Sequence, residues 1–206
     1  MRPLPRLLAV TDETVIGRED FAVRAAAIAA AGPAVAIVVR APSWSGARRL
    51  AALDRVRRLT TPPDAGLVAH GDPALGRLGR AHGVQVRAGD LAVVDCHRVC
   101  PGAWVGVSVH SVADARAARD DGADYLVAGN VFATASHPGR TARGLDWLGD
   151  VAAVGLPVVA IGGVTPETAA AVRDAGAWGA AAISALWNAA DPARATLELL
   201  DGLGER

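Results

Sequence analysis

The sequence predicts an α/β protein built as a single (β/α)8 (TIM) barrel domain over residues 1–206, and three observations lead to this prediction. Eight short apolar segments alternate with segments of helical pattern. The apolar segments lack the polar alternation of a half-exposed sheet, so they are typical of parallel strands buried on both faces. The alternative, an open doubly wound sheet, needs a glycine-rich nucleotide motif after the first strand, and residues 11–17 contain none.

The expected strands share an apolar body with polar residues at its carboxyl end. They cover residues 7–12, 34–40, 66–70, 83–87, 103–108, 124–128, 157–161 and 179–183. In a barrel these carboxyl ends meet at one mouth, where such folds place their active sites. The mouth is therefore expected to gather Thr11, Asp12, Arg40, His70, Arg87, Asp90, Ser108, His110, Asn130, Gly162, Gly163 and Ser184.

The expected helices are bounded by capping and helix-breaking residues. They cover residues 21–31, 47–59, 92–99, 112–121, 145–153, 165–176 and 192–203, and one more begins at Pro73. Asp20 and Ser111 are N-cap candidates, and the Asp72-Pro73 pair supplies an N-cap followed by an N1 proline. Several arginines of the 47–59 helix are expected to face water.

Composition and charge exclude several classes of protein. The formal net charge is zero and the arginines are scattered, so no nucleic-acid partner is expected. The amino-terminal apolar run is too short for a signal peptide or a membrane span, which favours a cytoplasmic location and no membrane contact. All 21 basic residues are arginine, which excludes a Schiff base on a lysine side chain.

No metal site is expected. Cys96 and Cys100 are interpreted as structural thiols rather than zinc ligands, since only His97 is a further ligand nearby. Asp90 with Asp12 is a weak candidate for holding a divalent cation, because no paired acids lie close together in the sequence.

The segment after residues 124–128 is the densest in functional groups. It carries Asn130, Thr134, Ser136, His137 and Arg143 within fourteen residues. His137 is a candidate proton donor and acceptor, with an exposed histidine of no function as the equal alternative. His110 is likewise either a mouth residue or a partner of the following helix.

The expected elements also indicate where one arginine and three other histidines lie. Arg40 is the only charge on its strand and would need an anion if buried. His70 ends a strand and is expected in the mouth, whereas His82 and His97 are expected on helix surfaces.

A phosphate site is expected where the last two strands end. Gly162 and Gly163 follow one strand, and Ile183 and Ser184 follow the other. Backbone N–H groups at these ends can bind a phosphate without a positive side chain, and barrels commonly hold phosphate there. The alternative is that the glycine pair only makes a tight turn.

Five motifs in this order resemble the thiamine-phosphate synthase and TenI (thiazole tautomerase) superfamily. They are Gly-Val-Ser-Val-His-Ser at 106–111, Gly-Ala-Asp-Tyr at 122–125, Gly-Asn-Val-Phe-Ala-Thr at 129–134, Arg-Gly at 143–144 and Ala-Ile-Gly-Gly-Val at 160–164. The resemblance covers nearly the whole chain. It implies a barrel that binds a phosphorylated thiazole or its product, thiamine phosphate, and a homo-oligomer is a possible state because relatives commonly self-associate.

The synthase type joins a pyrimidine diphosphate to a thiazole phosphate with magnesium. Its pattern has Gln-Leu-Arg-Glu-Lys after the second strand, where this chain keeps only Arg40, and Asn-Asp after the third, where it has His70 and Gly71. The lysine of the loop after the sixth strand is replaced by His137. The resemblance implies that Asp90 matches the other metal ligand. It further implies diphosphate contacts at Ser108, Thr134 and Ser136.

The tautomerase type resembles the loop after the sixth strand more closely, so the chain is interpreted as TenI-like, transferring protons on a phosphorylated thiazole. The histidine of the tautomerase motif is Asn130 here, so His137 or His110 is expected to transfer protons while Arg40 and Asn130 position the substrate. No cofactor is expected, and magnesium only for a synthase. The alternatives are a synthase with an altered metal site, a non-catalytic binder of thiazole or thiamine phosphate, and an enzyme of another pathway.

Overall fold

Eight parallel strands close into a barrel in the computed structural model, which describes residues 2–134 and 141–204. The strands are β1 (Leu7–Val10), β2 (Val35–Val39), β3 (Gly66–His70), β4 (Gly83–Arg87), β5 (Trp104–Val109), β6 (Tyr125–Gly129), β7 (Val158–Ile161) and β8 (Gly179–Ala182). Each strand pairs with the next in the sequence, and β8 pairs with β1 in the register Leu7 to Ala180. The expected barrel is confirmed.

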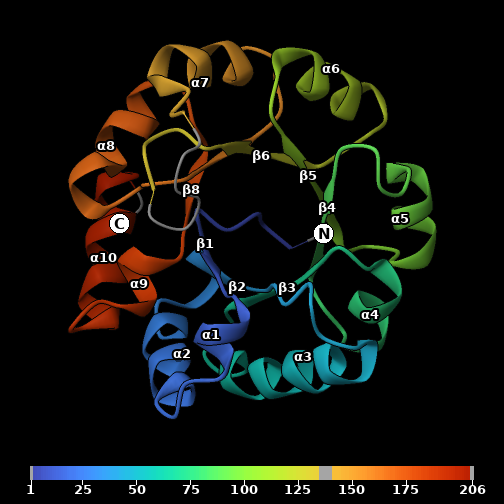
Figure 1. The fold of residues 1–206 in the computed structure, drawn as a ribbon, viewed down its shortest axis with the longest axis vertical. Coiled ribbons are helices and arrows are strands. Elements are labelled where there is room, and N and C mark those ends of the chain that lie inside the picture. Colours follow the sequence, from blue (N-terminus) through green and yellow to red (C-terminus); the bar gives the residue numbers. More distant parts are fainter. Residues whose placement is uncertain (1, 135–140, 205–206) are drawn as a thin grey trace.

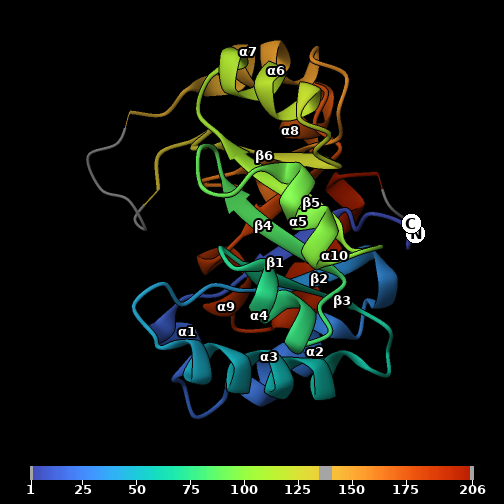
Figure 2. The same cartoon turned by 90° about the vertical axis from the view of Figure 1, so that its right-hand side faces the viewer.

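Helices form the outer ring around the strands, as Figure 1 shows. They are α1 (Glu13–Ile16), α2 (Phe21–Ala29), the 3-10 turn η1 (Gly32–Ala34), α3 (Gly46–Thr60), α4 (Pro73–Leu78), α5 (Val93–Val99), α6 (Val112–Asp120), α7 (Gly144–Ala152), α8 (Pro166–Asp174), α9 (Ser184–Trp187) and α10 (Pro192–Gly202). Figure 2 shows both chain ends at one end of the barrel, while the described parts of the β6–α7 connection project from the other. Among the described residues, no helix is long and apolar enough to cross a membrane.

Besides the turn η1 and shifts of one or two residues at the ends of elements, the structure differs from the sequence prediction in two short helices and one histidine. The first helix, α1, forms because Asp12 accepts a hydrogen bond from the Val15 N–H at 2.8 Å and so caps it. The other, α9, begins at Ser184 because β8 ends at Ala182, one residue earlier than expected. His82 lies in the connection between α4 and β4, not on a helix, and its Nδ1 accepts a hydrogen bond from the Leu67 N–H.

Aromatic rings fill the barrel interior where neighbouring strands carry glycine. A Cβ atom on Gly83 would lie 2.9 Å from the Trp104 ring, and one on Gly106 would lie 2.1 Å from the Tyr125 ring. Both distances are shorter than real contacts, so side chains at these positions would displace the rings. Trp104 and Tyr125 are almost completely buried. Together they close the interior beneath the mouth.

The two cysteines, which the sequence indicates are structural thiols, are both buried. Cys96 and Cys100 are both free thiols, and burial raises the pKa of each. The Cys100 Sγ–H donates to the Pro73 carbonyl at 2.9 Å. His97 contacts the Gly122 carbonyl instead. The pair therefore packs α5 and α4 against the barrel.

The Tyr125 hydroxyl is a test of this packing, because it is fully buried and makes no hydrogen bond to any residue that the structure describes. An unpaired buried hydroxyl costs about 1–3 kcal/mol. We expect Tyr125→Phe to raise the free energy of unfolding by about 1 kcal/mol in urea denaturation. Trp187→Phe is the contrasting variant: it loses the 2.8 Å bond from Nε1 to the Val10 carbonyl and should be destabilised. A loss above about 1 kcal/mol in Tyr125→Phe would contradict this view of the core.

Candidate active site

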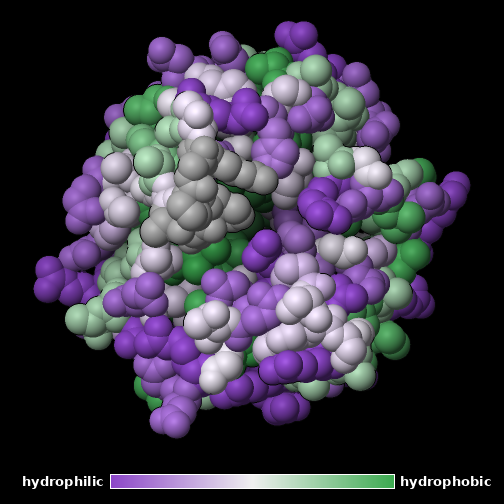
Figure 3. All heavy atoms as spheres, viewed as in Figure 1, coloured by the Kyte–Doolittle hydropathy of each residue, from purple (hydrophilic) through white to green (hydrophobic). Residues whose placement is uncertain are grey.

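A cavity of about 550 Å³ opens at the carboxyl ends of the strands. Figure 3 shows hydrophilic residues beside a hollow near the centre of this face, with apolar residues inside it. The cavity gathers most of the residues expected there. They are Arg40, His70, Arg87, Asp90, Ser108, His110, Asn130, Thr134, Gly162, Gly163, Ile183 and Ser184.

Two expected mouth residues do not line this cavity. Thr11 is fully buried, where its Oγ1 donates to the Val38 carbonyl at 3.0 Å and accepts from the Arg40 N–H at 3.1 Å. Asp12 serves as the cap of α1. Both side chains satisfy backbone groups, which the strand pattern alone did not predict. Ser136 and His137 lie outside the described residues.

At the wall formed by the ends of β7 and β8, the turn after β7 exposes backbone. Gly162 and Gly163 have φ of +96° and +68°. A Cβ on Gly162 would lie 2.5 Å from that of Asn130, and one on Gly163 would lie 2.4 Å from the Ala133 carbonyl oxygen. Only glycine fits this turn, because both the left-handed φ and the close approach exclude a side chain. A ligand at this wall can therefore contact the main-chain atoms of the turn directly.

The opposite wall, at β2 to β4, carries three arginines, which we call the arginine wall: Arg40 after β2, Arg49 in the first turn of α3 and Arg87 at the end of β4. The Arg40 guanidinium makes no hydrogen bond or ion pair with the residues that the structure describes. Arg49 reaches Asp72 only at 3.5 Å, and its buried Nε has no partner. Arg87 binds Asp90 through two hydrogen bonds of 3.0 and 3.2 Å.

Arg49 is a site residue that sequence reasoning missed, because it expected several arginines of this helix to face water and did not single out Arg49. Its side chain is only 24% exposed and lines the cavity. In a (β/α)8 barrel each helix begins near the mouth, because it follows the carboxyl end of a strand. Ser45 caps α3 by accepting from the Arg48 N–H, which places Arg49 one turn from the rim. The start of each helix near the mouth, rather than the periodicity of the helix, was the signal that could have identified Arg49.

Gln85 is a second site residue that sequence reasoning missed. It is 4% exposed in the middle of β4, and its Nε2 donates to the Ser108 Oγ at 3.0 Å and to the Val86 carbonyl at 3.3 Å. The Val86 carbonyl oxygen can only accept a hydrogen bond, so the Gln85 atom beside it must be the amide nitrogen. The same nitrogen therefore donates to the Ser108 Oγ. The Ser108 hydroxyl hydrogen is then free to donate into the cavity. A single polar residue between Val84 and Val86 was the available signal.

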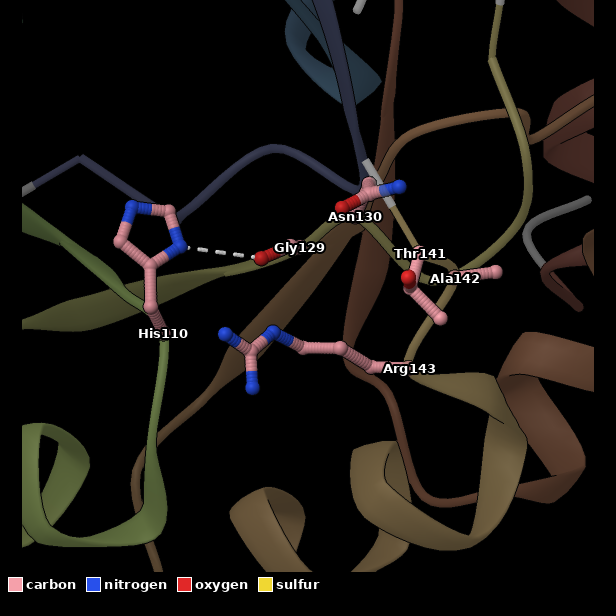
Figure 4. A pocket seen from close by; sticks show the side chains of 6 residues that line it. All are labelled: His110, Gly129, Asn130, Thr141, Ala142 and Arg143. Atoms are coloured by element: carbon pink, nitrogen blue, oxygen red, sulfur yellow. Dashed lines mark hydrogen bonds between the residues drawn. The ribbon is translucent and has the colours of Figure 1, made fainter. Parts of the chain in front are cut away.

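Beside the main cavity, a smaller pocket of about 430 Å³ shares His110, Gly129 and Asn130 with it and adds Thr141, Ala142 and Arg143. Figure 4 shows the Arg143 side chain extending toward the His110 side. The His110 Nδ1 lies 3.0 Å from the Gly129 carbonyl oxygen, which makes this nitrogen the donor and leaves Nε2 as the remaining ring nitrogen.

The described residues do not match what a magnesium ion requires. Magnesium is usually held by one or two carboxylates together with substrate oxygens. Asp90 is the only carboxylate among the described residues that line the cavity, and both of its oxygens bind Arg87. Position 71 is glycine with φ of +81°. Within the described chain, no group of three acidic, histidine or cysteine residues could hold a metal.

His70 lies half-buried in the mouth near three arginines. Burial, together with the charges of Arg40 and Arg87, lowers the pKa of His70 from 6.5 to about 4. The unfolded chain therefore binds more protons than the folded chain between about pH 4 and 6.5. The contribution of His70 to stability is fully present above pH 6.5 and is lost as the pH falls toward 4.

We expect the His70 ring resonances to titrate with a midpoint near pH 4 in an NMR titration of the folded protein. The signals are assigned by their disappearance in His70→Asn. The same variant should lose part of the dependence of unfolding free energy on pH between 4 and 6.5. A midpoint above pH 6 would contradict this electrostatic description of the mouth.

Comparison with known proteins identifies the family. The family described as thiamine monophosphate synthase matches residues 7–186. A thiamine-phosphate synthase of Methanoculleus marisnigri is 40% identical over 201 residues, which are 95% of this chain and 93% of that protein. That of Laribacter hongkongensis is 36% identical over 193 residues, covering 92% and 91%.

A solved structure gives the same result. The structure described as thiamine phosphate pyrophosphorylase from Pyrococcus furiosus matches with a TM-score of 0.79 and 29% identity, covering 97% of this chain and 95% of that one. These comparisons confirm the superfamily expected from the motifs, and the relatives carry the name of the synthase rather than the tautomerase. The chain belongs to the thiamine monophosphate synthase family.

Proposed function

We propose that this protein is a thiamine-phosphate synthase, a transferase of thiamine biosynthesis that joins a pyrimidine diphosphate to a thiazole phosphate. One observation carries the proposal: the cavity has two walls suited to anions, a backbone wall at β7 and β8 and the arginine wall at β2 to β4. Two phosphorylated substrates need two such places. A tautomerase acting on one thiazole phosphate would need only the first.

The thiazole phosphate is assigned to the backbone wall. Its phosphate would accept hydrogen bonds from main-chain N–H groups at Gly162, Gly163, Ile183 and Ser184, which need no positive side chain. Asn130, at the end of β6 beside Gly162, is positioned to orient the ring. Its Nδ2 donates to the Phe132 carbonyl at 3.3 Å, which directs the amide oxygen elsewhere.

The diphosphate is assigned to the opposite side, near Ser108 and the arginine wall. In the reaction, the thiazole nitrogen attacks the methylene carbon of the pyrimidine, and the carbon–oxygen bond to the diphosphate breaks. The diphosphate leaves with the bonding electron pair, so negative charge develops on it. Guanidinium groups and the Ser108 hydroxyl stabilise that charge in place.

Formation of thiamine phosphate depends less on proton-transferring side chains than tautomerisation does. The attacking nitrogen carries no proton, so bond formation needs no general base. Tautomerisation needs a group that both takes and gives a proton, whereas Asn130 cannot titrate and the low pKa of His70 keeps its ring neutral. The Nδ1 of His110 contacts the Gly129 carbonyl, so Nε2 is the ring nitrogen left for such a proton transfer. The site and the named relatives together favour the synthase, which the sequence analysis kept as an alternative.

The direct test incubates the protein with hydroxymethylpyrimidine diphosphate and thiazole phosphate and measures thiamine phosphate by chromatography. A parallel reaction with carboxythiazole phosphate follows its aromatic tautomer. We expect thiamine phosphate in the first and no catalysed tautomerisation in the second. Tautomer without thiamine phosphate would overturn the proposal, and so would tight binding of both ligands without turnover.

Arg40→Gln should lower kcat/KM for thiamine phosphate formation about 100-fold, because the variant removes a donor from the departing diphosphate. Arg48→Gln is the matched control. Its guanidinium is exposed and lies 3.7 Å from the centre of the Trp44 ring, away from the cavity lining, so its activity should match the parent. Equal rates in the two variants would contradict the assignment of Arg40.

A further inference from the structure

We propose that the arginine wall binds the diphosphate directly and takes the place of a divalent cation, so that binding and turnover do not depend on magnesium. The inference rests on the proposed function for the identity of the substrate. Its structural basis is the juxtaposition of Arg40, Arg49 and Arg87 in a cavity whose described lining has Asp90 as its one carboxylate.

The acidic groups of this rim are already committed. Asp90 is bound through both oxygens by Arg87, and these hydrogen bonds lower the pKa of its carboxyl. Asp72 follows Gly71 but is turned toward the protein, with one oxygen accepting from the Leu75 N–H at 3.1 Å and the other facing Arg49. A cation would have to displace an arginine at either position.

The charge balance of the rim favours an anion over a cation. Among the described residues, three guanidinium groups against the carboxylates of Asp90 and Asp72 leave a formal charge of about +1. The neighbouring His70 remains neutral near pH 7, because its pKa is lowered to about 4. A divalent cation would add to the repulsion between these groups, whereas a diphosphate of several negative charges would neutralise it.

The arginines also have N–H groups that can donate hydrogen bonds to phosphate oxygens. The guanidinium of Arg40 has no hydrogen bond or ion pair with the described residues, and Arg49, which is 24% exposed, meets Asp72 only at 3.5 Å. Arg87 is 71% exposed, so it can bind phosphate oxygens while keeping Asp90. A guanidinium presents a planar fork of donors that matches two phosphate oxygens, which a lysine or a metal-bound water does not. The wall thus supplies several charge-assisted hydrogen bonds from one direction.

The test uses inorganic pyrophosphate as the probe and the full chain as the protein. Isothermal titration calorimetry is run with excess EDTA and then with excess magnesium chloride. We expect binding in EDTA, with an affinity no weaker than that in magnesium. Binding that appears only with magnesium would overturn the inference, whatever the outcome of the activity assay.

Variants show whether the arginine wall makes this contact. Arg49→Gln should weaken pyrophosphate binding in EDTA at least tenfold, and Arg49→Lys should restore part of it, since lysine keeps the charge but not the fork. Arg48→Gln, one residue away on the exposed side of α3, should bind as the parent does. Equal weakening in Arg48→Gln and Arg49→Gln would show non-specific attraction and overturn the inference.

The activity assay separates this inference from the proposed function. Thiamine phosphate formed equally in EDTA and magnesium supports both. Formation only with magnesium would overturn the inference and leave the synthase in place. Pyrophosphate bound in EDTA by a protein that makes no thiamine phosphate would overturn the proposed function, while binding of a diphosphate by the arginine wall would stand.

Discussion

Positive charges held close together in a folded protein need a counter-charge, and this requirement shapes the mouth of the barrel. Arg40, Arg49 and Arg87 share a rim where Asp90 is the only acidic residue among the described lining. Burial, together with the charges of these arginines, lowers the pKa of His70 to about 4. The proposed function assigns an anion to this rim and a second anion to the opposite wall of the cavity.

The wall assigned to the second anion, at the ends of β7 and β8, depends on glycines that carry no side chain. Gly162 and Gly163 leave the turn after β7 bare, because Asn130 and Ala133 approach too closely for a Cβ atom. Below the mouth, Tyr125 and Trp104 pack against strand glycines and close the interior. Small residues thus open one wall of the cavity, while large rings fill the space under it. The result is one cavity with a backbone wall and a cationic wall.

The barrel and most of the mouth could be predicted from the sequence, because buried parallel strands carry a plain apolar pattern and end at one face. Arg40, Asn130 and the glycine pair were found in this way. Arg49 and Gln85 were missed, since one lies on a helix that the pattern assigned to solvent and the other on a strand assigned to the core. Thr11 and Asp12 were wrongly included, because local hydrogen bonds to backbone groups compete with the mouth for their side chains. Such competition is visible only in three dimensions.

The central claim is that two anions occupy opposite walls of one cavity at the same time. It is tested most directly by titrating inorganic pyrophosphate, in EDTA, into protein already saturated with thiazole phosphate. The account predicts that pyrophosphate still binds, one per chain, with an affinity close to that for the free protein. Competition between the two ligands would contradict the account, because it would mean that both anions use a single place.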